Sequence, residues 1–213
     1  MCVALLMCVV AAQANDYTNG TAKLVVTNYP QAREVLRKNC IVVTSTGQIA
    51  VAWAAAQGML ARPRLLDDIQ RAYTASLAPG KHCGFTITPK PASSNVWLYV
   101  NVDKEPSEII EVARYGPEPD CGEILFRVDG ERFFGHFQVV LALRTRPDGV
   151  GWTSYQADLW AYPENGFIRF FVRNLGLIER FFRKKTGEIE KIVRAVVLQL
   201  NREQLVSMAA EPT

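Results

Sequence analysis

The sequence predicts an α+β domain: a curved antiparallel sheet of six to seven strands packed against one long C-terminal helix, with further helices near the N-terminus. Two observations predict it. Between residues 84 and 162, apolar residues alternate with polar ones between turn signals, which is typical of an antiparallel sheet with one buried face. Downstream, apolar residues recur at helical spacing: Phe167, Phe171, Leu175, Ile178, Phe182, Ile189, Val193, Val196 and Leu200. The apolar sides of the sheet and the helix must bury each other.

The composition is that of an ordinary globular protein. The chain has 213 residues, of which 49% are hydrophobic and 21% charged. At this length, one domain with a sizeable core is expected. A formal charge of +3 is too small to indicate a nucleic-acid partner, which requires a concentrated basic surface.

The first fourteen residues predict a secretory signal. Met1 to Ala14 contains no charge, and Ala12-Gln13-Ala14 places small residues at the −3 and −1 positions of a cleavage site. A buried N-terminal segment is the alternative, whereas the run is too short to cross a bilayer. We therefore expect a secreted or periplasmic protein with a signal peptide at 1–14, an N-terminal extension at 15–39 and the main domain at 40–205.

Helical and extended segments alternate before the sheet. Pro30 suits the first turn of a helix, and Pro79-Gly80 ends another. The run that begins at Gln48 is Ala-rich, although its first residues could instead form a strand. The expected elements are a strand at 23–27, a helix at 31–38, a strand at 40–44, and helices at 48–60 and 64–77.

Six strands follow, expected at 84–88, 96–102, 109–115, 123–128, 132–145 and 152–162. Asp129-Gly130 is the sharpest turn signal, because a two-residue type I′ turn needs positive φ at both central residues. A turn there pairs Phe126 with Phe133. It places Ile124, Phe126 and Val128 on one face together with Gly135, Phe137, Val139, Leu141 and Leu143, and it places Phe134, His136, Gln138 and Arg144 on the other face.

Phe167 to Arg173 could continue the sheet through a hairpin, but the spacing of Phe167, Phe171 and Leu175 favours a helix. Gly176 and Gly187 each cost about 1 kcal/mol in a helix interior. One of the two glycines is expected to mark a kink or a division into two helices.

Three cysteines remain if the signal is removed. In an oxidising compartment, one disulfide and one free thiol are the simplest outcome, and we favour Cys83 with Cys121 because both stand at strand starts. Three buried free thiols, Cys40 included, are the alternative. The chain has two histidines and no CxxC pair, so no metal site and no cofactor are expected.

The order of elements resembles the START-like superfamily, also described as the helix-grip or polyketide cyclase/SRPBCC fold. The segments that carry the resemblance are residues 158–166, DLWAYPENG, and residues 167–173, FIRFFVR. The resemblance implies a hydrophobic cavity between sheet and helix that holds a lipid or another apolar small molecule. The predicted ligand contacts are Phe126, Phe137, Leu141, Tyr155, Leu159, Leu175, Ile178 and Phe182.

From the residues alone, these side chains form a core. Gly135 and Ala157 are small residues on the same face and favour leftover space, although glycine in a strand can equally mark a kink.

Two other functions remain open. An enzyme of the cyclase or hydrolase type would use His136 as a general base with Asp158 as its partner, unless the two are a surface cross-strand pair. A non-catalytic envelope interaction protein would have a filled interior and an exposed apolar patch.

Arg180, Arg183, Lys184 and Lys185 form a basic patch on the C-terminal helix. Such a patch suits peripheral contact with anionic lipid headgroups, or it is an ordinary solvated helix face.

Overall fold

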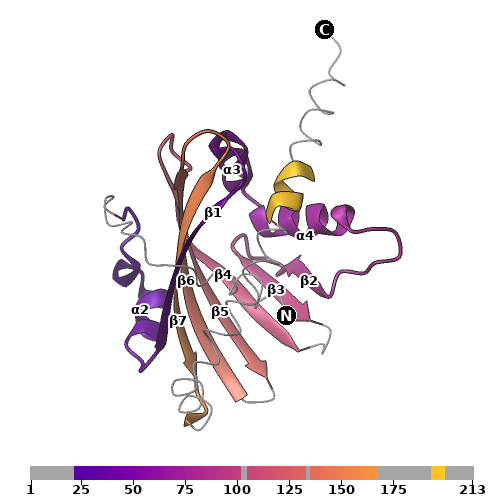
Figure 1. Cartoon of the computed structure of the whole chain (residues 1–213). Helices are drawn as coiled ribbons and strands as arrows, with labels where there is room; N and C mark the ends of the chain where they lie inside the picture. Colours follow the sequence, from indigo (N-terminus) through magenta and orange to yellow (C-terminus); the bar gives the residue numbers. More distant parts are fainter. Residues whose placement is uncertain (1–21, 102–104, 133–134, 167–192, 200–213) are drawn as a thin grey trace.

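A computed structural model of the chain describes residues 22–101, 105–132, 135–166 and 193–199 (Figure 1). Residues 193–199 are helical. The other elements, in chain order, are η1 (Val26–Asn28), α2 (Pro30–Leu36), β1 (Ile41–Ile49), α3 (Trp53–Leu60), α4 (Leu65–Ser76), β2 (Phe85–Pro89), β3 (Val96–Asn101), β4 (Pro106–Tyr115), β5 (Gly122–Arg132), β6 (Gly135–Pro147) and β7 (Thr153–Pro163).

One antiparallel sheet of seven strands, in the order β1-β7-β6-β5-β4-β3-β2, forms the centre of the molecule. Each strand from β2 to β6 pairs with the next along the chain, and β1 pairs with β7. Helices α3 and α4 connect the two edge strands, β1 and β2. The structure therefore confirms the α+β class and the expected order of an early strand, two helices and six antiparallel strands.

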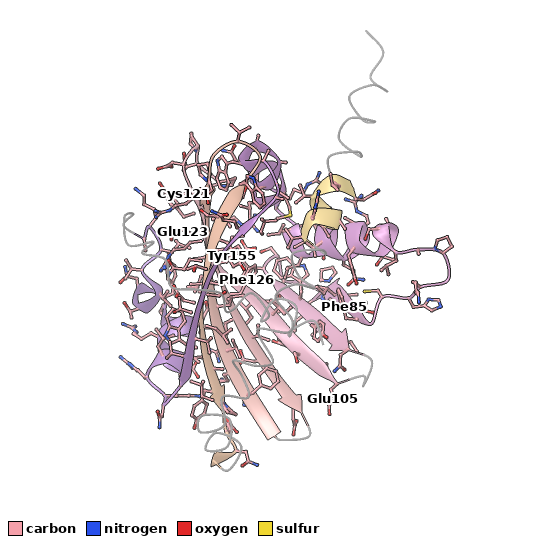
Figure 2. The ribbon with its side chains drawn as sticks, in the orientation of Figure 1. Phe85, Glu105, Cys121, Glu123, Phe126 and Tyr155 are labelled. Carbon is pink, nitrogen blue, oxygen red and sulfur yellow. The ribbon has the colours of Figure 1, made fainter. Side chains whose placement is uncertain are left out.

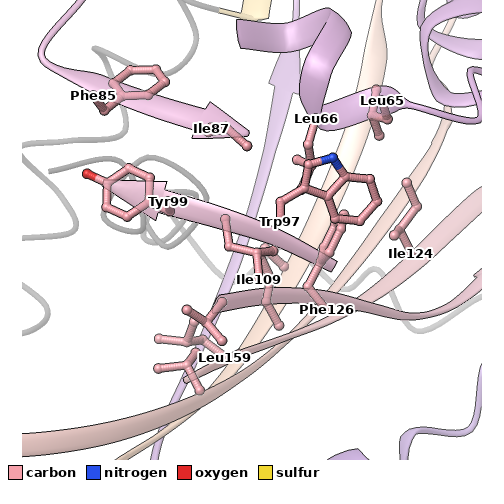
Figure 3. Close-up of a cluster of buried hydrophobic side chains, with 14 of the residues drawn as sticks. Leu65, Leu66, Phe85, Ile87, Trp97, Tyr99, Ile109, Ile124, Phe126 and Leu159 are labelled. Carbon is pink, nitrogen blue, oxygen red and sulfur yellow. The ribbon is translucent and has the colours of Figure 1, made fainter. Parts of the chain in front are cut away.

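The two faces of the sheet are covered by different helices. We call the face that packs against α3 and α4 the inner face, and residues 193–199 pack mainly on these two helices (Figure 1). It carries the main buried cluster (Figure 3), which consists of Leu60, Leu65, Leu66, Phe85, Ile87, Trp97, Tyr99, Ile109, Ile124, Phe126, Val128, Phe137, Val139, Leu141, Ala157 and Leu159. The alternation of apolar residues along the strands thus correctly predicted this buried face.

A segment from Ala22 to Leu36, which we call the N-terminal strap, covers the opposite, outer face. Its buried residues are Leu24, Val26, Ala32 and Val35, and they pack on Leu125, Val140 and Ala142 of the sheet. The expected strand at 23–27 is wrong. Glu123, rather than a strand ladder, accepts the backbone N–H groups of Lys23 and Leu24, at 3.0 and 2.7 Å.

The turn predicted at Asp129-Gly130 is also wrong, because β5 continues through both residues to Arg132. Phe126 pairs with Leu141 rather than Phe133. Asp129 lies in the sheet as a cross-strand partner of Gln138, whose Nε2 donates to its Oδ1 at 2.8 Å. Leu141 and Phe133 are an even number of residues apart, so the shift in register left every described side chain on its expected face.

Gly130 is a close-contact glycine within a strand. A Cβ built there would lie 2.3 Å from Ser107 Oγ and 2.9 Å from the ring of Phe137. Gly130 is therefore needed because the side chains of Ser107 and Phe137 pack over its backbone, and not because the chain turns there.

The strand that was expected to end at Thr44 continues to Ile49, and α3 begins at Trp53. The first residues of the run that begins at Gln48 thus belong to the strand, which is the alternative given for them in the sequence analysis. Pairing with β7 over all nine residues of β1 explains the extension.

Residues 193–199 are helical as expected, and Val196 and Val197 are buried. The rest of the predicted C-terminal helix, with Phe167, Gly176 and Gly187, lies outside the described residues, as do Phe133 and Phe134. Within the described part of the chain, no helix has the length and apolar character needed to cross a membrane.

Candidate functional site

The described ligand-contact candidates come from the three adjacent strands β5, β6 and β7. Phe126, Phe137, Leu141 and Leu159 belong to one buried cluster on the inner face. Tyr155 is also buried, and its ring lies over Gly47 on the neighbouring strand, where a Cβ would meet its hydroxyl oxygen at 2.5 Å. Leu175, Ile178 and Phe182 lie outside the described residues. The structure therefore brings together the sheet half of the predicted set.

An aromatic group from α4, β2 and β3 extends this surface and was missed by the sequence reasoning. Tyr73 stacks on Phe85, with ring centroids 5.6 Å apart, and Phe85 lies 6.2 Å from Tyr99. Trp97 donates its indole N–H to Asp67 Oδ1 at 2.9 Å. The alternation of large aromatic residues at Trp97 and Tyr99 could have placed both side chains on the buried face of the sheet.

Two buried polar atoms on this side of the molecule have neither a hydrogen bond nor an ion pair among the described residues. They are Ser107 Oγ, at the start of β4, and Trp53 Nε1, at the start of α3. Ser107 is 2% exposed and lies opposite Tyr99 on one side and Gly130 on the other. Because native proteins pair nearly all buried polar groups, Ser107 Oγ and Trp53 Nε1 are exceptions among the described residues.

A β-bulge in β4 places an ion pair on the inner face, beside the C-terminal end of α3. The register shifts between Glu111 and Ala113, so Glu111 and Arg114 lie on the same face, although residues three apart in a regular strand lie on opposite faces. Arg114 pairs with both carboxylate oxygens of Glu111, at 2.8 and 2.6 Å. Its Nη1 also donates to the carbonyls of Leu60 and Arg62, at 2.5 and 2.8 Å, which fixes the C-terminal end of α3 on the sheet.

The pairing of His136 with Asp158 is wrong. His136 Nδ1 is 3.1 Å from Glu164 Oε1, beyond the end of β7. Asp158 lies opposite Ala142, further along β6, and its carboxylate accepts hydrogen bonds from Thr44, Arg144 and Gln156. Both residues belong to the outer face. Their separation removes the proposed catalytic pair.

The predicted disulfide is also wrong, because Cys40, Cys83 and Cys121 are free thiols. Strands β2 and β5 are three positions apart in the sheet, a separation of about 14 Å. They also run in opposite directions, so Cys83 before β2 and Cys121 before β5 lie at opposite ends. Figure 2 shows this arrangement through Phe85 and Cys121. Cα atoms further apart than about 7 Å cannot be bridged.

We expect all three thiols to be alkylated under denaturing conditions without reductant. In the native protein, burial raises the pKa of the Cys121 thiol, and burial also raises the pKa of Cys40. A raised pKa lowers the thiolate fraction at a given pH, so both residues should react slowly with iodoacetamide at pH 7.5 and faster as the pH rises. Peptide mapping by mass spectrometry measures each site, and a Cys83–Cys121 peptide pair would contradict the structure.

Among the described residues, no group of three or more His, Cys, Asp or Glu side chains is placed to hold a metal ion. The basic residues Arg180, Arg183, Lys184 and Lys185 lie outside that part of the chain.

No family model and no curated protein matches the chain. Similar solved structures include norcoclaurine synthase from Thalictrum flavum in complex with dopamine and hydroxybenzaldehyde (13% identity, covering 91% of this chain and 100% of that one, TM-score 0.44). A conserved protein from Geobacillus kaustophilus has 13% identity and a TM-score of 0.44, over 73% of this chain and 97% of its own. A protein from Arthrobacter aurescens has 10% identity and a TM-score of 0.40, over 70% of this chain and 86% of its own. Because these TM-scores are below 0.5, they assign neither a family nor an activity.

Proposed function

We propose that the protein binds an apolar or amphipathic small molecule, with lipids as the leading class, against the inner face of the sheet. The observation that carries the proposal is the buried hydroxyl of Ser107, which lies within a surface of aromatic and aliphatic side chains and has no hydrogen-bond partner in the described part of the chain. Burying a hydroxyl without a hydrogen bond costs about 1–3 kcal/mol in proteins. A polar group of a bound molecule would supply the missing hydrogen bond.

The distribution of polar groups favours an amphipathic ligand. Ser107 stands at the end of the sheet where β4 begins, and Asn101, another buried polar residue, lies on the same face at the end of β3. From there, the inner face continues through Phe126, Leu141 and Leu159, which are all apolar. A ligand could place its polar group at Ser107, where it would form a hydrogen bond with the hydroxyl, and its apolar part along Phe126, Leu141 and Leu159.

Export and membrane contact are further parts of the proposal. The support for export is the uncharged run from Met1 to Ala14, with the small residues Ala12 and Ala14 at the −3 and −1 positions of a cleavage site. An exported carrier that meets a membrane through Arg180, Arg183, Lys184 and Lys185 would be able to exchange lipid there.

Organic extraction of the purified protein, followed by mass spectrometry, tests the proposal directly. We expect co-purified lipid at a stoichiometric level, and we expect delipidated protein to bind a fluorescent fatty acid. An extract without lipid, together with no binding of the fatty acid, would contradict the proposed function.

The variant S107A tests the role of the hydroxyl. In the ligand-free protein, we expect S107A to leave the free energy of unfolding unchanged or to raise it by up to about 1 kcal/mol, because an unpaired buried polar group is removed. We expect the affinity for the fluorescent fatty acid to fall by about tenfold, the effect of losing one hydrogen bond of about 1.4 kcal/mol.

The matched control is T145V, which removes a buried hydroxyl that already donates to the Gly122 carbonyl at 3.0 Å. T145V should lower stability by about 1–2 kcal/mol and leave the affinity unchanged. Equal affinities for S107A and the unmodified protein would exclude Ser107 as a ligand contact.

A further inference from the structure

The sheet has two edge strands, and β2 is the one that is protected by residues in the described part of the chain. This strand has five residues, ends at Pro89 and is followed by Lys90, features that natural proteins use to block edge pairing. Helix α4 also caps its backbone. The side chain of Gln70 accepts from the N–H of Ile87 at 3.1 Å and donates to the carbonyl of Phe85 at 3.5 Å, so one amide takes the place of a neighbouring strand.

Among the described residues, none of these protective features occurs at the opposite edge, β1. Its nine residues, IVVTSTGQI, include no charged residue and no proline. The strand pairs with β7 without a bulge along its whole length. Within the described part of the chain, no strand pairs with its other side. A long, neutral, regular edge rich in β-branched residues is a site for pairing with another strand.

We propose that two copies of the protein pair through β1 to form a dimer with a continuous sheet. We favour a second copy of this chain as the partner, because β1 has no charged residue and two β1 strands can therefore pair without bringing like charges together. An interface that uses the same surface on both copies closes on a two-fold axis. Two open edges would instead allow extension into a fibre, and the protection of β2 by Gln70 and Pro89 prevents that outcome.

The symmetry predicts the register. An antiparallel pair that uses the full length of β1 has its two-fold axis at the middle of the strand, so Ile41 of one copy faces Ile49 of the other and Val42 faces Gln48. Val42 is 59% exposed and Gln48 is also exposed, so both positions accept charged residues without disturbing the core. Each contact occurs twice in the dimer.

Two double variants test the register. In V42K/Q48K, like charges face each other at both symmetry-related contacts, whereas in V42E/Q48K opposite charges do. Both variants share Q48K, and the two positions are too far apart along the strand to interact within one copy. The charge at position 48 also suits Asp148, which the native Gln48 contacts at 2.6 Å.

We expect sedimentation equilibrium to show a concentration-dependent dimer for the unmodified protein. The dissociation constant of V42K/Q48K should be at least tenfold higher than that of V42E/Q48K, because cross-strand charge pairs each contribute up to about 1 kcal/mol. Hydrogen exchange in residues 41–49 should slow as the concentration rises, while exchange in residues 85–89 stays unchanged.

A protein that stays monomeric at millimolar concentration would overturn the proposal. Equal dissociation constants for the two double variants would also overturn it, because the dimer would then use another surface. Circular dichroism of each variant shows whether the monomer remains folded.

Discussion

Replacing Arg114 by methionine should lower the free energy of unfolding by about 3 kcal/mol, the typical effect of removing one partner from a buried ion pair. The Arg114 side chain is 17% exposed and forms an ion pair with Glu111. Its guanidinium also donates hydrogen bonds to the backbone carbonyls of Leu60 and Arg62. Methionine keeps much of the volume but leaves the carboxylate of Glu111 and the end of α3 without donors. Urea unfolding followed by circular dichroism measures the loss.

Two further variants show whether the geometry or only the charge matters. R114K keeps the charge but loses the planar fork, so we expect an intermediate loss. R64M breaks the ion pair of Arg64 with Asp67, where Arg64 is 64% exposed, and should cost less than about 1 kcal/mol. If R114M and R64M had equal effects, Arg114 would not be the residue that holds α3 on the sheet.

Replacing Glu123 by alanine should release the N-terminal strap and lower stability by about 3 kcal/mol. This buried carboxylate, labelled in Figure 2, is the acceptor for the backbone N–H groups of Lys23 and Leu24. It also lies 4.0 Å from Arg144 Nε. Without it, two backbone donors lose their partner, and the apolar outer face loses the anchor of its cover.

Hydrogen exchange gives the localised readout for this change. Amides from 22 to 36 should exchange faster in E123A, while the strands of the inner face keep their protection. E34A is the control, because Glu34 also joins the strap to the sheet through Arg127 but is 56% exposed, so its loss should cost less than about 1 kcal/mol. Unchanged exchange in the strap of E123A would show that Leu24, Val26, Ala32 and Val35 hold it without the carboxylate.

The candidate site could be predicted from the sequence only in part. The alternation of residues in β5, β6 and β7 identified Phe126, Phe137, Leu141 and Leu159 as neighbours on one buried face, because side-chain direction in a strand has a period of two. Ser107 was not found. Its significance depends on the lack of a hydrogen-bond partner among the described residues of the folded protein, and a sequence does not contain that information.

The wrong predictions share one physical cause, because each was decided by pairing and packing contacts that local sequence preferences do not contain. Asp129-Gly130 has the local preference of a tight turn, but pairing with Gln138 and Phe137 and packing under Ser107 outweigh it. The expected disulfide and the expected His136–Asp158 pair likewise depend on which strand ends meet.

The sequence by itself determined the class of the fold, the order of its main elements and the face on which the described residues of β5 and β6 lie. These properties follow from hydrophobic periodicity, which is local and survives an even shift of register. Only the tertiary structure decided the register of β5 with β6, the capping of the β2 edge by Gln70 and the use of Lys23 and Leu24 as backbone donors to Glu123. These contacts join residues up to a hundred positions apart, so they exist only after the chain has folded.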